Sequence, residues 1–487
     1  MKKILMTLTI VINILLIILI PLKLFIINIY IPESISTILA EIIIMLNISI
    51  LIKTKKIYKS MIIISIPSII FGLLGTYCNP YWNSINFNNV SYYSKQYDKV
   101  ITKKQSLEDL EYAMKYLKKV HPKLKKNTPS EIQEQYEIVK SNIKNQDTIT
   151  VNYLAKEIES IFSKLNDSHT EIDAYYKEEH ILKQIKDHDK NKENLIKIND
   201  IDIKEIFEQN KQYYSYEMEE AGFKEFKKDL TTLEGLDKLG INIDEIKYTF
   251  ELNKKEKQYT YKKEDFITKK EYNEINNIEK TQKSFVTYEI DKENNIAILY
   301  LDNCRNNDEY KRVLKEFFTQ VKENNIENIA LDLRNNNGGT SSVAKEFLKY
   351  INIDIYHQME EEWRFGPFTI KSKEKTIKNK KKDNPFNGKI YVLTSIDTFS
   401  SAMLFTQYIK DNNIGTIIGE TSKNSSNGYG EITSFKLPNS QIHMQISTKK
   451  FKRINQSAGD FIEPDIKCDS KEAIFKLYDT IKSIREN

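Results

Sequence analysis

The residues with the clearest chemical potential lie where predicted strands give way to predicted helices. Ser400 lies in Asp397-Thr-Phe-Ser-Ser-Ala402, and Gly338 and Gly339 lie in Asp332-Leu-Arg-Asn-Asn-Asn-Gly-Gly-Thr340. A serine at a helix N-terminus commonly does no more than cap the helix. The same position would also stabilise an alkoxide, and neighbouring backbone amides could bind a developing oxyanion. These segments therefore fit acyl transfer, although on spacing alone an ordinary strand–helix turn explains the glycines better.

A nucleophilic serine also needs a base that accepts its proton. The chain has six histidines, and His169 in Leu165-Asn-Asp-Ser-His-Thr170 follows an amphipathic helical pattern among polar neighbours. A histidine in such a place is more often exposed and idle, so neither residue alone identifies an enzyme. The other histidines lack partners at metal-ligand spacing, and we expect neither a metal nor a cofactor. His121 is interpreted as a structural residue at a helix end.

From Phe285 onward, predicted strands alternate with predicted helices, and these elements would position the serine and the glycines. Such alternation predicts an α/β domain with right-handed crossovers and a largely parallel, buried sheet. Chemistry in such sheets lies outside the carboxyl ends of the strands, which brings the serine and the glycines to one edge. The predicted strands are Ile296–Leu301, Ile329–Leu333, Ile390–Thr394 and Thr416–Ile418, and the predicted helices are Asp308–Asn324, Ser341–Ile351 and Phe399–Asp411.

The residues before this domain have other patterns. Helical spacing of apolar residues begins at Ser106 and stops before His121-Pro122, and a second helix is predicted over Tyr153–Leu165. A middle section follows, rich in Lys, Glu and Asn. It is predicted to hold a strand–turn–strand at Asn194–Ile203, helices within Ile206–Leu239 and strands over Tyr248–Tyr261. The seven lysines of Lys371–Lys382 predict a solvated loop.

The first eighty residues are apolar and predict a membrane anchor. The runs Ile4–Leu22, Ile35–Ile52 and Met61–Cys78 are each long enough for a helix that crosses about 30 Å of hydrocarbon. Lysines precede the first run and crowd the loop between the second and third, so the positive-inside rule puts both clusters in the cytoplasm. Three spans then leave everything after Cys78 on the extracytoplasmic side of the cell membrane.

Composition excludes several other classes. The chain has 487 residues, and its 73 Lys+Arg against 68 Asp+Glu give a formal charge of only +5, so nothing indicates nucleic-acid binding. Cys78, Cys304 and Cys468 are scattered without a CxxC pair, which indicates neither a disulfide framework nor a zinc site.

Taken together and in order, the motifs resemble those of the C-terminal processing, or tail-specific, serine peptidases, in their tricorn-like branch. The resemblance covers most of the chain after residue 105. It implies a crotonase-like fold of ββα units and a middle section similar to a degenerate PDZ module. The motifs are Leu110–Leu124 with its His-Pro ending, Asn166–Thr170, Asp332–Gly339, Thr398–Ala402, Gly419–Thr421, Tyr429–Glu431, Leu437–Ser440 and Glu463–Ile466.

The resemblance also implies a role for each matched residue. Ser400 matches the nucleophile, His169 the general base, and Ser168 the serine that orients the histidine. The amide of Gly338 or Gly339, together with that of Ser401, would form the oxyanion hole. The late acidic residue of the tricorn-like branch corresponds to Asp460 or Glu463, without a clean match at either. A Ser-Lys dyad is the weaker expectation, because Ser425 occupies the lysine's position and Lys423 is out of phase.

The predicted division of the chain is an anchor at 1–80, a helical part at 81–176, a middle section at 177–284 and a catalytic domain at 285–487. The predicted function is a membrane-anchored serine endopeptidase that hydrolyses peptides or protein tails through an acyl-enzyme. One alternative is a catalytically inactive, membrane-anchored peptide-binding protein on the same fold. Another is a membrane sensor, but the loops offer too few residues for a cytoplasmic effector. The oligomeric state is not predicted.

Overall fold

The computed structural model describes residues 4, 7–15, 42–49, 52, 65–66, 84–85, 93–176, 178–278, 284–365 and 368–486. The predicted membrane runs Ile4–Leu22, Ile35–Ile52 and Met61–Cys78 lie largely outside these ranges. Among the helices that are described, none combines the length and the apolar character that a membrane crossing requires.

The C-terminal domain is built on a six-stranded sheet, and it confirms the predicted strands. β10 lies at one edge and is antiparallel to β11, whereas the other neighbours are parallel. Every residue of β12 is buried, as expected for a parallel strand that is covered on both faces. The strands in spatial order are β10 (Val286–Asp291), β11 (Ile296–Leu301), β12 (Asn328–Asp332), β17 (Lys389–Thr394), β18 (Thr416–Gly419) and β21 (Ile466–Lys467).

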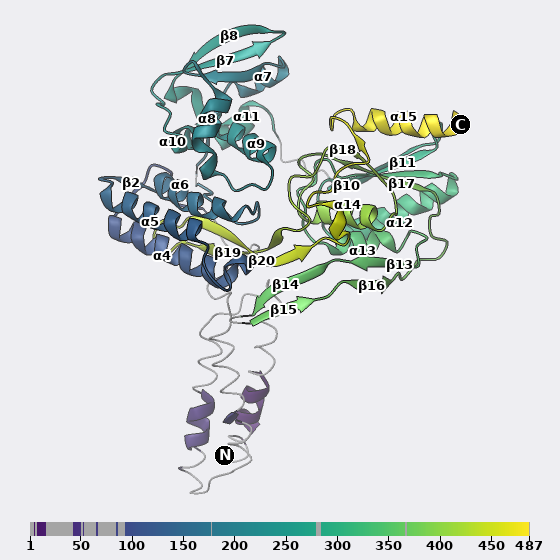
Figure 1. The fold of residues 1–487 in the computed structure, drawn as a ribbon, viewed down its shortest axis with the longest axis horizontal. Coiled ribbons are helices and arrows are strands. Elements are labelled where there is room, and N and C mark those ends of the chain that lie inside the picture. The colour runs from purple at the N-terminus through teal and green to yellow at the C-terminus, as the bar shows by residue number, and fades with distance from the viewer. Residues whose placement is uncertain are drawn as a thin grey trace.

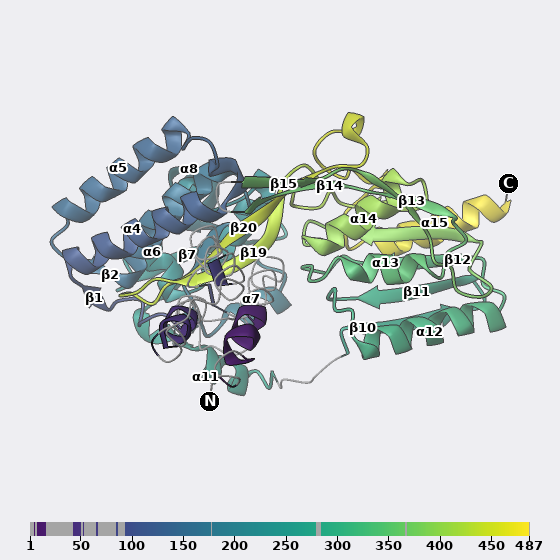
Figure 2. The same cartoon turned by 90° about the horizontal axis from the view of Figure 1, so that it is seen from below.

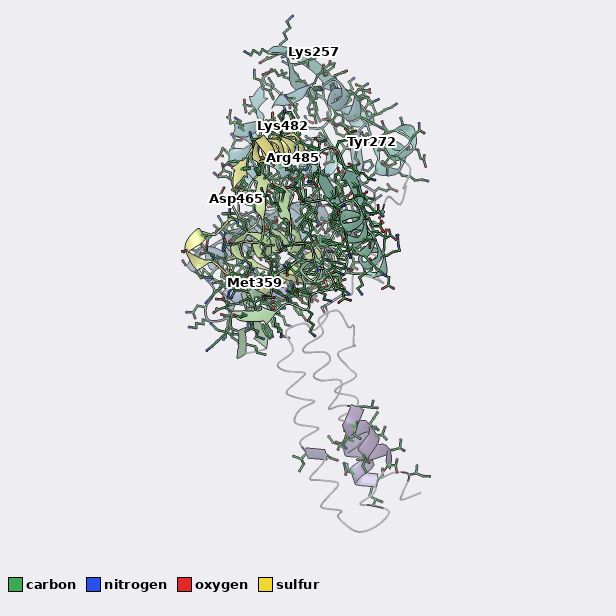
Figure 3. All side chains as sticks on the ribbon, turned by 90° about the vertical axis from the view of Figure 1, so that its right-hand side faces the viewer. Lys257, Tyr272, Met359, Asp465, Lys482 and Arg485 are labelled. Carbon is green, nitrogen blue, oxygen red and sulfur yellow. The ribbon has the colours of Figure 1, made fainter. Side chains whose placement is uncertain are left out.

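Helices cover both faces of this sheet (Figure 1). One face packs against α12 (Asp308–Glu323), α13 (Ser342–Leu348) and α14 (Ser401–Asp411), and the other against α15 (Ala473–Glu486). In Figure 3, Lys482 and Arg485 mark α15 on the side turned to the viewer. All three helices are shorter than predicted, α12 by one residue. α13 ends at Leu348, shortly before Ile351 pairs with Phe386, and α14 begins at Ser401 because Ser400 is not helical.

The N-terminal helices share their core with a hairpin from the far end of the chain. The hairpin of β19 (Tyr429–Lys436) and β20 (His443–Lys452) reaches from the sheet domain to α4 (Lys103–Val120), α5 (Ser130–Asn145) and α6 (Val151–Phe162), as Figures 1 and 2 show. Its buried apolar side chains join those of the three helices in one cluster. β20 also pairs with β3 (Glu171–Asp173), which follows His169 almost directly.

The residues 178–278, called the middle module below, have their own apolar core and their own antiparallel sheet. The sheet confirms the predicted strands and has the order β6-β5-β7-β8. Lys257 on β8 and Tyr272 on α11 mark the module in Figure 3. Its main elements are β5 (Asn194–Ile198), β6 (Ile201–Asp202), α8 (Ile203–Asn210), α9 (Glu219–Asp229), α10 (Leu233–Lys238), β7 (Ile246–Leu252), β8 (Lys255–Tyr261) and α11 (Lys269–Ile275).

The prediction of a solvated loop at Lys371–Lys382 is right about solvent exposure and wrong about much of the backbone. The segment holds the end of β15 (Phe368–Ser372) and all of β16 (Lys375–Lys378). β15 pairs with β14 (Glu360–Phe365), which also pairs with β20. Lys371 forms an ion pair with Glu362 across β14 and β15 at 2.7 Å. Opposite charges on facing strands stabilise such pairing, so a lysine-rich segment can form an edge strand.

Candidate active site

Ser400 occupies a strained turn between β17 and α14. Its φ of +55° and ψ of −120° are rare for a residue with a side chain, and such strain collects at functional sites. Hydrogen bonds hold the turn, because the Phe399 amide donates to the Asn336 carbonyl at 3.0 Å and the Ser400 amide donates to Asn424 Oδ1 at 2.9 Å. The Ser400 hydroxyl makes no capping hydrogen bond to α14. The capping interpretation is therefore wrong, and the strained turn between a strand and a helix leaves the hydroxyl free of the helix.

Two backbone amides near Ser400 are available to a ligand. Gly338 and Gly339 have φ of +97° and +136°. The Gly338 amide already donates to Asn336 Oδ1 at 2.8 Å. The amides of Gly339 and Ser401, by contrast, have no acceptor among the described residues. Of the two glycines that the motif offers, Gly339 is therefore the one whose amide can pair with that of Ser401 in an oxyanion hole.

Gly338 fits its place because it has no side chain. A Cβ there would lie 2.7 Å from Ser400 Cβ and 2.9 Å from the Phe399 carbonyl oxygen. We expect Gly338→Ala to lower the rate of labelling by a fluorophosphonate roughly 10²–10³-fold, the cost of a displaced oxyanion donor. Gly240→Ala is the control, because Gly240 also has a positive φ but has open space around it. Equal labelling rates in the two variants would contradict this account.

His169 lies beside the nucleophile turn. Its ring is buried and stacks on the Phe399 ring, with 4.3 Å between the ring centroids and 21° between the planes. Neither ring nitrogen has a hydrogen-bond partner among the described residues. Burial lowers the pKa of His169, the charge of Lys423 lowers it further, and the charge of Asp167 opposes both. The imidazole is thus held neutral with both nitrogens free, as a general base requires.

Asp167 is the carboxylate nearest to this imidazole, with 3.8 Å between Oδ1 and His169 Nδ1. Its Oδ2 accepts hydrogen bonds from His121 Nε2 at 3.1 Å and from Thr170 Oγ1 at 2.6 Å. Burial disfavours its charge, but His121, His169 and Thr170 outweigh burial and keep the pKa of Asp167 well below its usual range. His121 ends α4 as predicted, and it also binds the carboxylate that faces His169.

Ser168, the predicted orienting serine, binds a residue that sequence reasoning missed. Its hydroxyl donates to Glu217 Oε1 at 2.7 Å. Burial raises the pKa of Glu217 to about 8, and the charge of Asp167 contributes to the rise. Glu217 lies just before α9 in the middle module, among many glutamates and lysines, so no spacing or motif distinguished it.

The two late acidic residues lie apart from the histidine. Asp460 Oδ1 accepts from Asn427 Nδ2 at 2.9 Å, and Glu463 Oε2 accepts from Thr421 Oγ1 at 2.7 Å. Within the described residues neither carboxylate contacts His169 or Ser168. In a Ser-Lys dyad, the lysine would bind the serine hydroxyl. The ammonium group of Lys423 instead lies 4.7 Å from the centre of the Phe399 ring and 3.7 Å from Glu225.

Asp167, His169 and Glu217 offer ligand-type atoms within 4.8 Å of one another, the arrangement in the described residues that most resembles a metal site. Their carboxylate oxygens, however, already accept hydrogen bonds from Ser168, Thr170 and other neighbours. The arrangement is therefore accounted for as a hydrogen-bonded network around the histidine.

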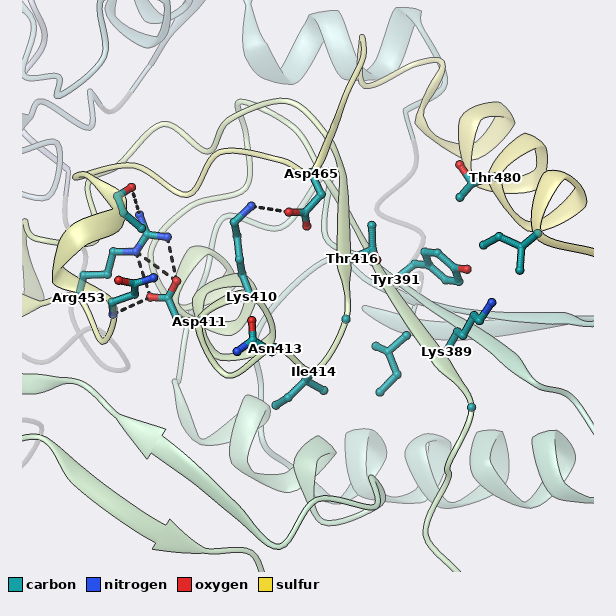
Figure 4. Close-up of a pocket in the computed structure, with 16 residues that line it drawn as sticks. Lys389, Tyr391, Lys410, Asp411, Asn413, Ile414, Thr416, Arg453, Asp465 and Thr480 are labelled. Carbon is teal, nitrogen blue, oxygen red and sulfur yellow. Dashed lines mark hydrogen bonds and ion pairs between the residues drawn. The ribbon is translucent and has the colours of Figure 1, made fainter. Parts of the chain in front are cut away.

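A cavity of about 730 Å³ lies away from this chemistry. Figure 4 shows it beside Lys389 at the start of β17, with Asp411 at the end of α14. Ser400 lies at the opposite ends of both elements. The cavity is thus not the place where Ser400 would meet a substrate.

The fold and the site together define a serine-type peptidase. Residues 295–468 match the model of peptidase family S41. No curated protein sequence matches the chain.

Several solved structures are similar. Mature CPAF in complex with lactacystin has a TM-score of 0.54 at 12% identity, covering 78% of this chain and 97% of that one. The photosystem II D1 C-terminal processing protease gives 0.42 at 11% identity, covering 77% and 97%. The tricorn protease gives 0.38 at 14% identity, covering 79% and 37%. At such identity, the likeness to CPAF supports the fold alone.

Proposed function

We propose that the chain is a membrane-anchored endopeptidase that cleaves peptides or protein tails on the extracytoplasmic side through an acyl-enzyme on Ser400. The observation that carries the proposal is the turn that holds Ser400 strained and uncapped, next to a buried histidine whose ring nitrogens are free. A crotonase-like fold and a PDZ-like ancestry of the middle module belong to the same proposal. They rest on the sequence resemblance.

In this mechanism His169 accepts the proton of Ser400 as the hydroxyl attacks a peptide carbonyl. The developing oxyanion binds the amides of Gly339 and Ser401, and His169 then protonates the leaving amine. A water molecule then attacks the acyl-enzyme by the same steps, which releases the carboxylic acid and restores Ser400. Because Asp167 stays ionised behind the imidazole, it stabilises the imidazolium that forms in both halves. Among the described residues no hydrogen bond joins His169 to Ser400, so in this mechanism the two side chains approach each other when substrate binds.

The distribution of side chains in the first eighty residues supports the anchor. Apolar side chains such as Leu8, Ile14 and Met45 are exposed, while Thr9 and Asn13 are buried. This arrangement is the reverse of a water-soluble helix cluster and fits lipid as the surrounding medium.

Polar side chains also join the three apolar runs. Ser65 Oγ accepts hydrogen bonds from Asn47 Nδ2 at 3.0 Å and from Asn13 Nδ2 at 3.5 Å. One residue comes from each run. Polar contacts of this kind join helices inside a membrane.

The proposal is tested by treating the full-length protein, in detergent micelles, with a fluorophosphonate and following adduct formation by intact mass. We expect one adduct in the wild type and none in Ser400→Ala. His169→Ala should slow labelling roughly 10²–10⁴-fold, the usual contribution of a general base. Because burial lowers the pKa of His169, protonation of this imidazole should not limit labelling at pH 6.5.

Ser457→Ala and His357→Ala are matched controls, since Ser457 is exposed, His357 is half-buried, and both lie outside the site. An adduct that survives in Ser400→Ala would place the reactive group elsewhere. A folded wild type that forms no adduct would favour the other candidate, a peptide-binding protein without turnover.

A further inference from the structure

The middle module reaches the active site through one short stretch, residues 217–225. Glu217 binds Ser168, and Glu225 lies 3.7 Å from Lys423. Between them, Lys224 forms an ion pair with Asp397, three residues before the nucleophile. These charged contacts belong to a module with its own core, so they are docking contacts and not part of the peptidase domain's packing.

Glu217 differs from the other two residues because its two carboxylate oxygens bind different halves of the site. Oε1 accepts from the hydroxyl of Ser168 at 2.7 Å and from its amide at 3.3 Å. Oε2 accepts from the amide of Ser425 at 2.7 Å. Ser168 precedes His169, and Ser425 follows Asn424, whose side chain accepts from the Ser400 amide at 2.9 Å. A single carboxylate thus connects the segment of the base to the segment of the nucleophile.

We propose that Glu217 is a positioning residue that sets the loop of His169 (residues 166–170) against the loop beside Ser400 (residues 420–428). Docking of the middle module would then complete the active site. The inference rests on the proposed function of Ser400 and His169. It assigns the acidic position to a residue outside the peptidase domain, in place of Asp460 and Glu463.

The charge of Glu217 gives this role a signature in the pH dependence. Hydrogen bonds to a carboxylate are stronger than those to a neutral acid, so the ionised form holds both loops better. The pKa of Glu217 is raised to about 8, so the residue is mainly neutral at pH 6.5 and mainly charged at pH 9. Glu217→Gln resembles the neutral form at every pH. If Glu217 were purely structural, the ratio of the labelling rates of wild type and Glu217→Gln would be the same at every pH.

The test measures fluorophosphonate labelling of the full-length protein in detergent from pH 6.5 to pH 9. We expect the wild type and Glu217→Gln to label at nearly equal rates at pH 6.5, and the wild type to be roughly tenfold faster at pH 9. Glu220→Gln is the matched control, because this exposed glutamate lies in the same stretch. A constant ratio of the two rates across the range, or no difference, would overturn the proposal.

Hydrogen exchange of the same proteins tests the contact without reference to activity. In Glu217→Ala, amides of residues 166–170 and 420–428 should both exchange at least severalfold faster, while those of β7 and β12 stay unchanged. Unaltered exchange in either loop would overturn the proposal. If Ser400→Ala removes the adduct but Glu217 variants behave as wild type, the inference fails and the proposed function stands. If no adduct forms, the proposed function fails. Hydrogen exchange alone then tests whether Glu217 holds the two loops together.

Discussion

Replacing Asp167 by asparagine is expected to slow fluorophosphonate labelling of Ser400 roughly 10²–10⁴-fold, with the fold retained. Asparagine keeps the size of the side chain but removes the charge that faces His169 Nδ1 at 3.8 Å. The imidazolium would then form without a counter-charge, and its ring could be held in the wrong tautomer. The measurement is the labelling rate at pH 7, with intact mass as the readout. Asp244→Asn, at an exposed position, serves as the control.

The same substitution should also change the stability in a pH-dependent way. The folded protein keeps the pKa of Asp167 below its ordinary value of about 3.9. The stability that this charge contributes is therefore present above about pH 3.9 and is lost as the pH falls toward the folded pKa. The melting midpoint of Asp167→Asn should lie below that of the wild type at pH 7, and the gap should narrow at pH 3. A gap that is equal at both pH values would contradict the assignment of an ionised Asp167.

The largest expected loss of stability follows from Arg453→Met. Arg453 and Asp411 are both almost completely buried, with 2.8 Å between Nη2 and Oδ1. Arg453 Nη1 also donates to the carbonyls of Ala458, Gly459 and Phe461. Figure 4 shows this pair beside the cavity. Methionine would fill much of the volume but leave a buried carboxylate unpaired, which costs about 3–5 kcal/mol.

Thermal unfolding followed by intrinsic fluorescence should show a midpoint lowered by ~10 °C in Arg453→Met. Asp411→Asn in the same background should restore part of the loss, because it removes the unpaired charge. Lys452→Met is the matched control. Lys452 pairs with Glu360 at the exposed surface, and such pairs contribute little to stability. Equal melting midpoints in Arg453→Met and Lys452→Met would show that the buried Arg453–Asp411 pair does not stabilise the fold as stated.

The sequence was most informative where the pattern of neighbouring residues along the chain determines the structure. The strands that carry Asp332 and Thr394 were predicted almost to the residue, because continuous apolar runs mark buried parallel strands. The predicted oxyanion glycines and Ser400 lie together because they end adjacent strands. His169 lies beside them because β3 pairs with β20.

Long-range partners could not be predicted in the same way. Glu217 lies 49 residues from Ser168 and 208 from Ser425, and its identity as a partner depends on how two separately folded parts meet. The lysine-rich strands β15 and β16 were missed for a related reason. The charge of Lys371 on β15, for example, is matched by Glu362 on another segment, so composition alone predicted a loop.

The hairpin of β19 and β20 also constrains when the enzyme can become active during its synthesis. Helices α4 to α6 are made early, but Phe435, Met444 and Ile446, which complete their core, emerge more than 260 residues after Phe162. The half that carries His169 cannot finish folding until almost the whole chain has left the ribosome. A truncated or stalled chain would therefore lack the packed segment of His169 even if it already contained Ser400. Under the proposed mechanism, this interwoven topology would therefore delay activity until synthesis is nearly complete.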